Sequence, residues 1–362
     1  MKKILIVNKM YSPDIGGVET VVKQYAEYLA KMYDVTVLVG NSKLSIRTRY
    51  ETLNNVKIIR CSSFGIFFSM PISVPLFLHL ILRRNNYDVV HFHEPFPIAS
   101  VISLFKKKNK YIVTWHSDVI KQKVLKKIVT IFQKLLCRKA DVILTTSPQM
   151  VESSCVLSDF KDKIEVVPLS IAEEKYHEQP VSPGDFYLYI GRISYYKGII
   201  HLIDSFELSN TKYPLYIVGN GSKRLVDEIN NKISKSRKKI IFINKYVTDQ
   251  EKRDFLSRSR ALLFPSIYPS EAFGIIQLEA MIYQKPVINT SLDTGVPWVS
   301  LNRVTGITVE PENIQELANA ITSLDSDDLV EEYGVSAKKR VLEIFNDSTV
   351  LEKLNTIYLK QF

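Results

Sequence analysis

Two glutamates that lie eight residues apart, Glu271 and Glu279, point most directly to chemistry in this sequence. An apolar strand at 261–264 is expected to lead into a helix that starts near Phe273 or Gly274. Glu271 then precedes the helix and Glu279 lies inside it. A carboxylate before a helix is often only a cap. Glu279, however, has apolar neighbours that do not suit an idle surface acid.

The start of the same helix is a second binding feature. The first amide N–H groups of a helix have no acceptor within the helix itself. We therefore expect the amides of Phe273, Gly274 and Ile275 to be free to donate hydrogen bonds to a polar or anionic ligand.

Two cations, Arg192 and Lys197, lie five residues apart on one loop. Gly191 ends the strand before this loop and Gly198 begins the helix after it. Both cations can therefore turn into one cleft. Fixed cations suit a diphosphate leaving group, because negative charge grows on that group as a glycosidic bond breaks. Two solvated surface cations are the alternative interpretation.

A further ligand loop is expected near the N-terminus, where Gly16 and Gly17 stand between the first strand and the first helix. Glycine lets a backbone approach a ligand closely, and the start of the helix offers free N–H groups to an anion. A simple left-handed turn fits the two glycines equally well.

Strands and helices alternate along both halves of the chain and must position these loops. The expected strands are 4–8, 35–39, 56–60, 89–93, 111–115, 142–145 and 164–167 in the first half, and 186–190, 215–218, 240–243, 261–264 and 286–289 in the second. Regular alternation predicts an α/β protein with two doubly wound parallel sheets. The natural site of such a protein is a crevice at the carboxyl ends of the strands.

The chain has 362 residues, which suits two domains. A polar, turn-rich stretch at 173–185 is interpreted as the linker. We therefore expect an N-terminal domain at 1–172 and a C-terminal domain at 186–345. A last helix at 346–362 is expected to pack back on the N-terminal domain.

A dinucleotide-binding dehydrogenase is the obvious rival for this pattern, and the glycine spacing argues against it. A G-x-G-x-x-G turn should follow the first strand. The loop from Lys9 to Ile15 is too long for that turn. Gly219 and Gly221 do follow a strand, but Arg224 stands where the third glycine should be.

The segment EAFGIIQLEAM resembles the E-x7-E motif of the retaining glycosyltransferases with the GT-B fold that are often called family 4. Seven other segments match this family in its order: IVNKMYSPDIGGVE, HFHEPFP, TWHSD, TTSPQM, VVPLSI, YIGRISYYKG and LYIVGNG. Together the matches span residues 1 to about 310. The resemblance implies two Rossmann-like domains that face each other across a cleft. The N-terminal domain would bind the acceptor and the C-terminal domain the nucleotide sugar.

The resemblance also implies residue roles. Catalysis would involve His116 near the transferred sugar, Glu271 on the sugar hydroxyls, and the phosphate-binding pair Arg192 and Lys197. The implied donor-binding residues are Gly16, Gly17, Gly191, Arg192, Lys197, Phe273, Gly274, Ile275 and Glu279, the last on the ribose hydroxyls.

The family retains the anomeric configuration, and its favoured mechanism is front-face substitution in which the leaving phosphate takes the acceptor's proton. Arg192 and Lys197 would then do with fixed charge what a metal ion does elsewhere. Asp325-Ser326-Asp327 matches the D-x-D of metal-dependent transferases, but it lies in a polar stretch rather than at a strand end. We interpret it as a loop, and expect no metal and no other cofactor.

The net charge of +10 is confined to the first half of the chain. Residues 1–175 carry 26 Lys or Arg and 15 Asp or Glu, which gives +11, and the rest carry 22 and 23, which gives −1. No basic-aromatic module suggests a nucleic-acid partner. An anionic membrane surface is the functional interpretation, and a solvated basic face is the bland one.

Two segments support the membrane interpretation. The stretch 64–82 has no Asp, Glu, Lys or Arg, but Pro71 and Pro75 favour a broken loop and a helix at about 75–84 over a spanning helix. The helix 119–139 has an apolar stripe surrounded by lysines. Three widely spaced cysteines indicate a reducing compartment. We therefore expect a cytoplasmic protein, peripherally attached to the inner face of the plasma membrane.

The resemblance is strongest to O-antigen mannosyltransferases. It implies transfer of a hexose from a nucleotide diphosphate sugar, with GDP-mannose the best guess, to a lipid-linked or growing surface polysaccharide. A UDP-hexose or UDP-hexosamine donor is the first alternative. A nucleotide-sugar 2-epimerase of the same architecture is the second, and a basic binding protein without activity is the third.

Overall fold

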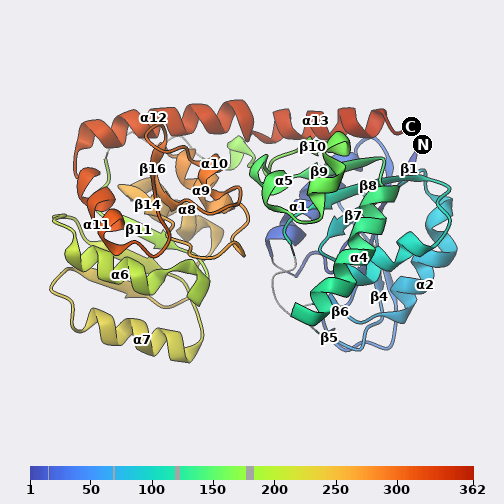
Figure 1. Cartoon of the computed structure of the whole chain (residues 1–362), viewed down its shortest axis with the longest axis horizontal. Coiled ribbons are helices and arrows are strands. Elements are labelled where there is room, and N and C mark those ends of the chain that lie inside the picture. Colours follow the sequence, from blue (N-terminus) through green and yellow to red (C-terminus); the bar gives the residue numbers. More distant parts are fainter. Residues whose placement is uncertain (15, 68–69, 119–122, 177–182) are drawn as a thin grey trace. The chain divides into compact units, whose positions relative to one another are not determined.

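The computed structural model describes residues 1–14, 16–67, 70–118, 123–176 and 183–362, with no side chains described at 123–126. These residues form two compact units (Figure 1). Unit 1 comprises Met1–Pro168 and Leu351–Phe362, and unit 2 comprises Leu169–Val350. Part of the expected linker, 177–182, lies outside the described residues, and Glu173–Lys175 before it forms a short 3-10 helix within unit 2.

Unit 1 is built on a sheet of eight strands among the described residues, in the order β10-β9-β8-β7-β1-β2-β4-β3. All pairs are parallel except β3 with β4. The strands are β1 (Lys3–Val7), β2 (Asp34–Gly40), β3 (Arg49–Leu53), β4 (Val56–Cys61), β7 (Val89–Glu94), β8 (Lys110–Trp115), β9 (Val142–Thr145) and β10 (Ile164–Val166). The apolar side chains of β1 are fully buried, as expected for a central strand with both faces covered.

Helices connect these parallel strands: α1 (Gly17–Leu29), α2 (Val74–Arg83), α3 (Pro97–Ser100), α4 (Lys123–Lys139) and α5 (Gln149–Ser153). α2 begins where expected, because the Ser73 hydroxyl accepts the N–H of Leu76 and a proline occupies the first turn. The last helix, α13 (Asp347–Leu359), belongs to unit 1 from Leu351 on. There the Tyr33 hydroxyl donates to Asn355 Oδ1 at 2.8 Å.

Unit 2 has an entirely parallel sheet in the order β13-β12-β11-β14-β15-β16 among the described residues. Its strands are β11 (Tyr187–Ile190), β12 (Leu215–Val218), β13 (Ile240–Ile243), β14 (Ala261–Leu263), β15 (Val287–Thr290) and β16 (Gly306–Val309). Its helices are α6 (Ile199–Leu208), α7 (Lys223–Ile233), α8 (Asp249–Arg258), α9 (Ile275–Met281), α10 (Val296–Val299), α11 (Ile314–Ser323) and α12 (Asp327–Ile344).

Successive side chains of β11 enter different cores of unit 2. Tyr187 and Tyr189 pack in one apolar cluster, whereas Leu188 and Ile190 pack in the other. Side chains alternate across a strand, so the sheet of unit 2 is buried on both faces. The predicted α/β architecture with two doubly wound sheets is confirmed.

Two strands that the sequence pattern missed complete the sheets. β3 is an edge strand with every residue exposed, so it carries no apolar alternation. β16 is a short strand that begins at Gly306. The apolar segment 64–82 contains a small antiparallel pair, β5 (Ile66–Phe67) with β6 (Met70–Pro71), before α2. In the described part of the chain, no helix is both long and apolar enough to cross a membrane.

Candidate functional site

Close backbone packing shapes the loop after β11. Gly191 has a φ of +150°, and Gly219 after β12 has a φ of +146°. A Cβ on Gly219 would overlap the carbonyl oxygen of Gly191, and the N–H of Ile193 donates to Asn220 O at 2.8 Å. These glycines therefore let two loop backbones pack together. This contact explains the glycine pair that superficially resembled a dinucleotide-binding turn.

The same loop is anchored to the loop that follows β14, the neighbouring strand in the sheet. Gly198 has a φ of +69°, and a Cβ there would overlap the carbonyl oxygen of Pro265. The N–H of Ile267 donates to Tyr196 O at 2.8 Å. Because parallel strands end at the same edge of a sheet, this contact brings Lys197 beside the residues that follow β14.

Lys197 forms an ion pair with Glu271, although 74 residues separate them. The two side chains are only 14% and 12% exposed. The ammonium also lies 4.8 Å from the centre of the Phe264 ring. Burial weakens the competition from water, so this pair holds each partner more firmly than a surface ion pair would.

Arg192 belongs to the same group. Its guanidinium donates to the Tyr196 hydroxyl at 3.2 Å. That contact, and then the charge of Glu271, raise the pKa of Arg192. The structure therefore brings together three of the predicted catalytic residues, Arg192, Lys197 and Glu271, at the carboxyl edge of the sheet of unit 2.

The backbone between Glu271 and α9 depends on Gly274. Its φ of +78° is left-handed, and a Cβ there would lie 2.5 Å from the Phe264 ring. Within the described residues, the amide N–H groups of Phe273, Gly274 and Ile275 have no hydrogen-bond acceptor. They are therefore available to a ligand, as the sequence predicted.

Glu279 lies inside α9 and is 8% exposed. Its Oε1 accepts hydrogen bonds from Lys252 Nζ at 2.7 Å and from the Tyr176 hydroxyl at 3.1 Å. Burial, followed by the charge of Glu279, raises the pKa of Tyr176, so this phenol stays protonated and donates. Sequence reasoning missed Lys252 and Tyr176, because they lie on α8 and near the linker, far from Glu279 in the chain.

In unit 1, Gly16 and Gly17 lie at the start of α1. Gly16 is extended, with a φ of −173°, and Gly17 does not have a positive φ. The left-handed turn is therefore the wrong interpretation. A Cβ on Gly17 would meet no atom within 4 Å, which leaves room for a ligand there. The Glu19 carboxylate lies against Gly16, and its burial raises its pKa.

His116 follows β8 and is almost completely buried. Its Nε2 forms a hydrogen bond with His93 Nδ1 on β7, at 2.9 Å. Burial lowers the pKa of His116 to about 3, and the charge of nearby Lys9 acts in the same direction. His116 is therefore neutral at physiological pH. Lys9 also interacts with Glu19, which links His116 to the start of α1.

A fully buried carboxylate, Glu94, anchors this edge of unit 1. It accepts hydrogen bonds from the N–H of Phe96, the hydroxyl of Ser100 and the amide of Gln133, at 2.7 to 2.9 Å. The sequence did carry a signal for this region, because HFHE places three polar residues on a strand whose two faces are buried.

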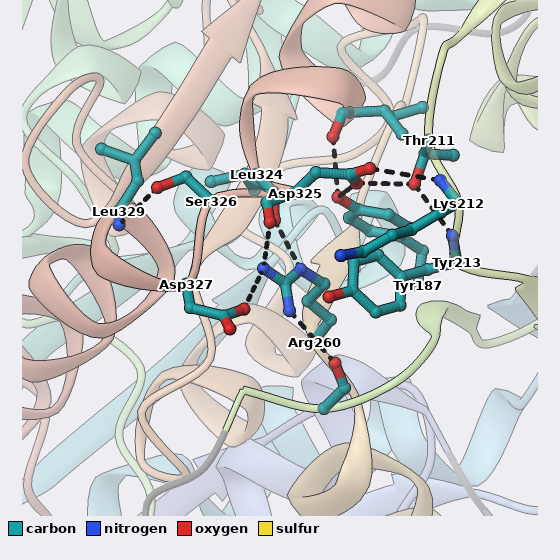
Figure 2. A network of polar contacts seen from close by, with 12 residues as sticks. Tyr187, Thr211, Lys212, Tyr213, Arg260, Leu324, Asp325, Ser326, Asp327 and Leu329 are labelled. Atoms are coloured by element: carbon teal, nitrogen blue, oxygen red, sulfur yellow. Dashed lines mark hydrogen bonds and ion pairs between the residues drawn. The ribbon is translucent and has the colours of Figure 1, made fainter.

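The Asp325-Ser326-Asp327 segment has partners within the protein (Figure 2). Asp325 accepts from the Tyr187 hydroxyl at 2.9 Å and the Thr211 hydroxyl at 2.6 Å. Arg260 donates to Asp327 Oδ1 at 2.6 Å and to two main-chain carbonyls at 2.5 and 2.8 Å. These contacts tie β14 to the α11–α12 turn. Among the described residues, no group of three or more His, Cys, Asp or Glu side chains could hold a metal ion.

Two Rossmann-like units, one of them with a Lys–Arg–Glu group at its sheet edge, define the class of proteins with the GT-B fold. Solved structures agree on the fold. Sucrose-phosphate synthase from Thermosynechococcus elongatus has a TM-score of 0.81 at 18% identity, and covers 99% of both chains. Anabaena Alr3699/HepE in complex with UDP has a TM-score of 0.78 at 16% identity, and covers 99% of this chain and 100% of the other.

Sequence comparisons identify the family. Residues 172–340 match the family "Glycosyl transferases group 1", and residues 15–175 match "Glycosyltransferase Family 4". The D-rhamnosyltransferase WbpZ of Pseudomonas aeruginosa is 30% identical over 71% of this chain and 70% of its own length. The O-antigen chain mannosyltransferase C of Escherichia coli is 27% identical over 98% of both chains. The chain belongs to the family 4 type of GT-B glycosyltransferases.

Proposed function

We propose that this protein transfers a hexose, with retention of configuration, from a nucleotide diphosphate sugar to a lipid-linked or growing surface polysaccharide. One observation carries the proposal. Arg192, Lys197 and Glu271 meet at one sheet edge of a glycosyltransferase fold, where two cations and a carboxylate suit a sugar diphosphate.

Each group has a distinct role in the proposed reaction. Arg192 and Lys197 offset the charge that grows on the diphosphate as its bond to the anomeric carbon breaks. The acceptor oxygen bonds to that carbon on the same face, and its proton passes to the departing phosphate oxygen. Glu271 accepts hydrogen bonds from sugar hydroxyls. The ion pair with Lys197 holds its carboxylate in place.

The remaining residues of unit 2 hold the rest of the donor. The amides of Phe273, Gly274 and Ile275 donate to sugar and phosphate oxygens, and Gly191 allows the diphosphate to approach the backbone. Glu279 accepts hydrogen bonds from the ribose hydroxyls. Its Oε1 is held by Lys252 and Tyr176, while within the described residues Oε2 has no hydrogen-bond partner.

Unit 1 supplies a second set of contacts in this proposal. Gly16 and Gly17 have no side chain, so the diphosphate can approach their backbone closely. His116 contacts the transferred sugar. As a neutral imidazole, His116 can donate or accept a hydrogen bond without adding charge.

GDP-mannose is the proposed donor. The relatives named as O-antigen mannosyltransferase and D-rhamnosyltransferase support a deoxyhexose or hexose of this kind and a polysaccharide product. A UDP-hexose or UDP-hexosamine remains the second candidate, supported by the structural neighbour in complex with UDP. A nucleotide-sugar 2-epimerase would use the same Arg192, Lys197 and Glu271 without an acceptor.

Attachment to the inner face of the plasma membrane is part of the proposal, and an edge of unit 1 supports it. We define the edge lobe as residues 43–49 with 63–67, joined by the antiparallel bridge of Ser45 and Ser63. It exposes apolar and basic side chains together, namely Leu44, Ile46, Phe64, Ile66 and Phe67 with Lys43, Arg47 and Arg49. Anionic lipid suits both kinds of side chain.

A thermal-shift panel of nucleotide sugars tests the donor, because a ligand of the native state raises apparent stability by mass action. We expect GDP-mannose to raise the melting temperature more than UDP-glucose or UDP-N-acetylglucosamine. NMR of the reaction then separates the activities. Transfer that needs an acceptor supports the transferase, whereas an isomerised sugar nucleotide formed without an acceptor would identify the epimerase.

Excess chelator tests the role of Arg192 and Lys197. We expect transfer to continue in EDTA, because fixed cations rather than a metal ion stabilise the leaving group. Activity that EDTA abolishes and Mg²⁺ or Mn²⁺ restores would contradict this role.

A further inference from the structure

Three buried histidine rings form a continuous row inside unit 1. His91 and His93 lie on the same face of β7, with ring centres 4.4 Å apart. The rings of His93 and His116 are nearly parallel, at 17°, and lie side by side with their centres 5.2 Å apart. The far end is anchored by hydrogen bonds. His91 Nδ1 lies 2.7 Å from the Tyr358 hydroxyl and His91 Nε2 lies 2.6 Å from the Thr114 hydroxyl. The near end is His116, the predicted sugar contact.

Only one of the two bonded nitrogens between His93 and His116 carries a hydrogen. Burial lowers the pKa of both residues far below physiological pH, and neighbouring charges act in the same direction. Each ring is therefore neutral and has one N–H. Either His93 Nδ1 donates to His116 Nε2, or the reverse.

The other nitrogen of His93 decides between these arrangements. His93 Nε2 is enclosed and has no hydrogen-bond partner among the described residues. If the proton were on Nε2, the protein would bury an N–H donor without an acceptor. If the proton were on Nδ1, it would bury only an acceptor nitrogen without a donor. A buried donor without an acceptor is the rarer of these two cases. With the proton on Nδ1, the single N–H of His93 is used in the bond to His116.

We propose that His93 is a positioning residue that donates its Nδ1–H to His116 and so fixes His116 as the Nδ1–H tautomer. His116 then presents a hydrogen-bond donor, not a base, to its ligand. That the ligand is a sugar oxygen rests on the proposed function, whereas the tautomer itself does not.

This assignment has a chemical consequence. A donor N–H can hold a sugar hydroxyl or ring oxygen in place, but it cannot remove the proton of an acceptor hydroxyl. The departing phosphate is then the group that takes the proton, in agreement with the front-face reaction proposed above.

Nitrogen NMR of the intact chain with ¹⁵N-labelled histidine tests the tautomer directly. We expect a protonated Nδ1 and an unprotonated Nε2 for His116, with its signals assigned by their loss in His116→Gln. A protonated Nε2 on His116 in the unmodified protein would overturn the proposal. This readout needs no substrate, so it stands even if no transfer activity is found.

Two variants test the positioning. His93→Asn keeps an N–H donor near the position of Nδ1, whereas His93→Leu removes it. We expect His93→Leu to mix the tautomers of His116 and to lower kcat about tenfold, as the loss of one net hydrogen bond of about 1.4 kcal/mol predicts, with little change in donor KM. His93→Asn should restore both the tautomer and most of kcat.

His79→Leu is the matched control, because His79 on α2 is a partly buried histidine that lies outside the row. Its removal should leave the signals of His116 unchanged. If the Asn and Leu variants of His93 had the same kcat and the same His116 spectrum, His93 would only fill space and the proposal would fail. If His93→Leu did not fold, the spectrum of the unmodified protein and the Asn variant would decide.

Discussion

At the scale of single residues, the ion pair of Lys197 and Glu271 is central to the candidate site. Both side chains are largely buried, and Arg192 completes a group in which two positive charges face one carboxylate. A net positive charge remains for a diphosphate, while the carboxylate oxygens can accept hydrogen bonds from hydroxyls. Removal of Glu271 should therefore affect the sugar more than the nucleotide.

We predict that Glu271→Gln lowers kcat about a hundredfold or more, since it weakens a charged hydrogen bond to the sugar and releases Lys197. The dissociation constant of this variant for the nucleoside diphosphate should change by less than about threefold. Steady-state kinetics and calorimetry measure the two quantities. Glu228→Gln on the exposed face of α7 is the matched control. Weaker nucleotide binding with unchanged kcat would contradict the role of Glu271.

The buried histidines predict a pH dependence of stability. The pKa of His91 is about 3 in the folded protein, because burial disfavours its charged form, against 6.5 in the unfolded chain. Between pH 6.5 and pH 3, His91 is protonated in the unfolded chain but stays neutral in the native state. The stability that comes from a neutral His91 is therefore complete above pH 6.5 and is lost as the pH falls toward 3.

His91→Phe should remove this contribution. Between pH 7 and pH 5, the free energy of unfolding of the unmodified protein should fall by about 2 kcal/mol more than that of the variant. Urea unfolding at the two pH values measures the difference. An equal fall in both proteins would show that the native state accepts a proton at His91.

At the scale of elements, loops that lie far apart in the chain are locked together by specific contacts. Gly198 against Pro265 joins the loop after β11 to the loop after β14. At the other end of β14, Arg260 joins the strand to the α11–α12 turn (Figure 2). Its side chain is only 1% exposed. The guanidinium carbon of Arg260 also lies 4.3 Å from the centre of the Tyr213 ring, and this cation–π contact further stabilises the junction.

We predict that Arg260→Met destabilises the protein by about 2 to 4 kcal/mol, because it leaves buried carbonyl groups without donors. Denaturant unfolding measures the loss. Arg258→Met, two residues earlier and exposed, is the matched control and should change stability by less than about 0.5 kcal/mol. If Arg260→Met left the free energy of unfolding unchanged, the network in Figure 2 would not be what holds the α11–α12 turn.

At the scale of the whole molecule, the excess positive charge lies in the first half of the chain. The sequence pointed to the helix 119–139, of which 119–122 lie outside the described residues. The edge lobe adds a surface that the charge count did not reveal, and Ile46 at its centre is 91% exposed. α2 continues it along the chain, with Val74, Leu78 and Leu82 exposed four residues apart.

We predict salt-sensitive binding to vesicles that contain phosphatidylglycerol. Replacing Lys43, Arg47 and Arg49 together by Glu should weaken binding on the order of a hundredfold, because each cation near an anionic surface contributes about 1 kcal/mol. Co-sedimentation at increasing salt measures this effect. The matched control replaces three exposed cations of unit 2, Lys223, Arg224 and Lys235, by Glu.

The control protein should still bind as the unmodified protein does. Equal binding to neutral and anionic vesicles would contradict the electrostatic part of the prediction. Pelleting that resists both salt and alkaline wash would point to insertion instead.

The sequence by itself determined the family, the two doubly wound sheets and most strand positions. Each depends on local patterns, such as apolar runs of strand length and the spacing of Glu271 and Glu279. Even so, β3 was missed, because an edge strand exposed along its whole length has no apolar alternation.

Only the tertiary structure decided which side chains meet. Lys197 pairs with Glu271, Lys252 with Glu279, and His93 with His116, across 74, 27 and 23 residues. No local period encodes such pairs, since they depend on strand order and on how neighbouring loops pack. The tautomer proposed for His116 follows from one of these pairs, and it required the enclosed nitrogen of His93 that only packing reveals.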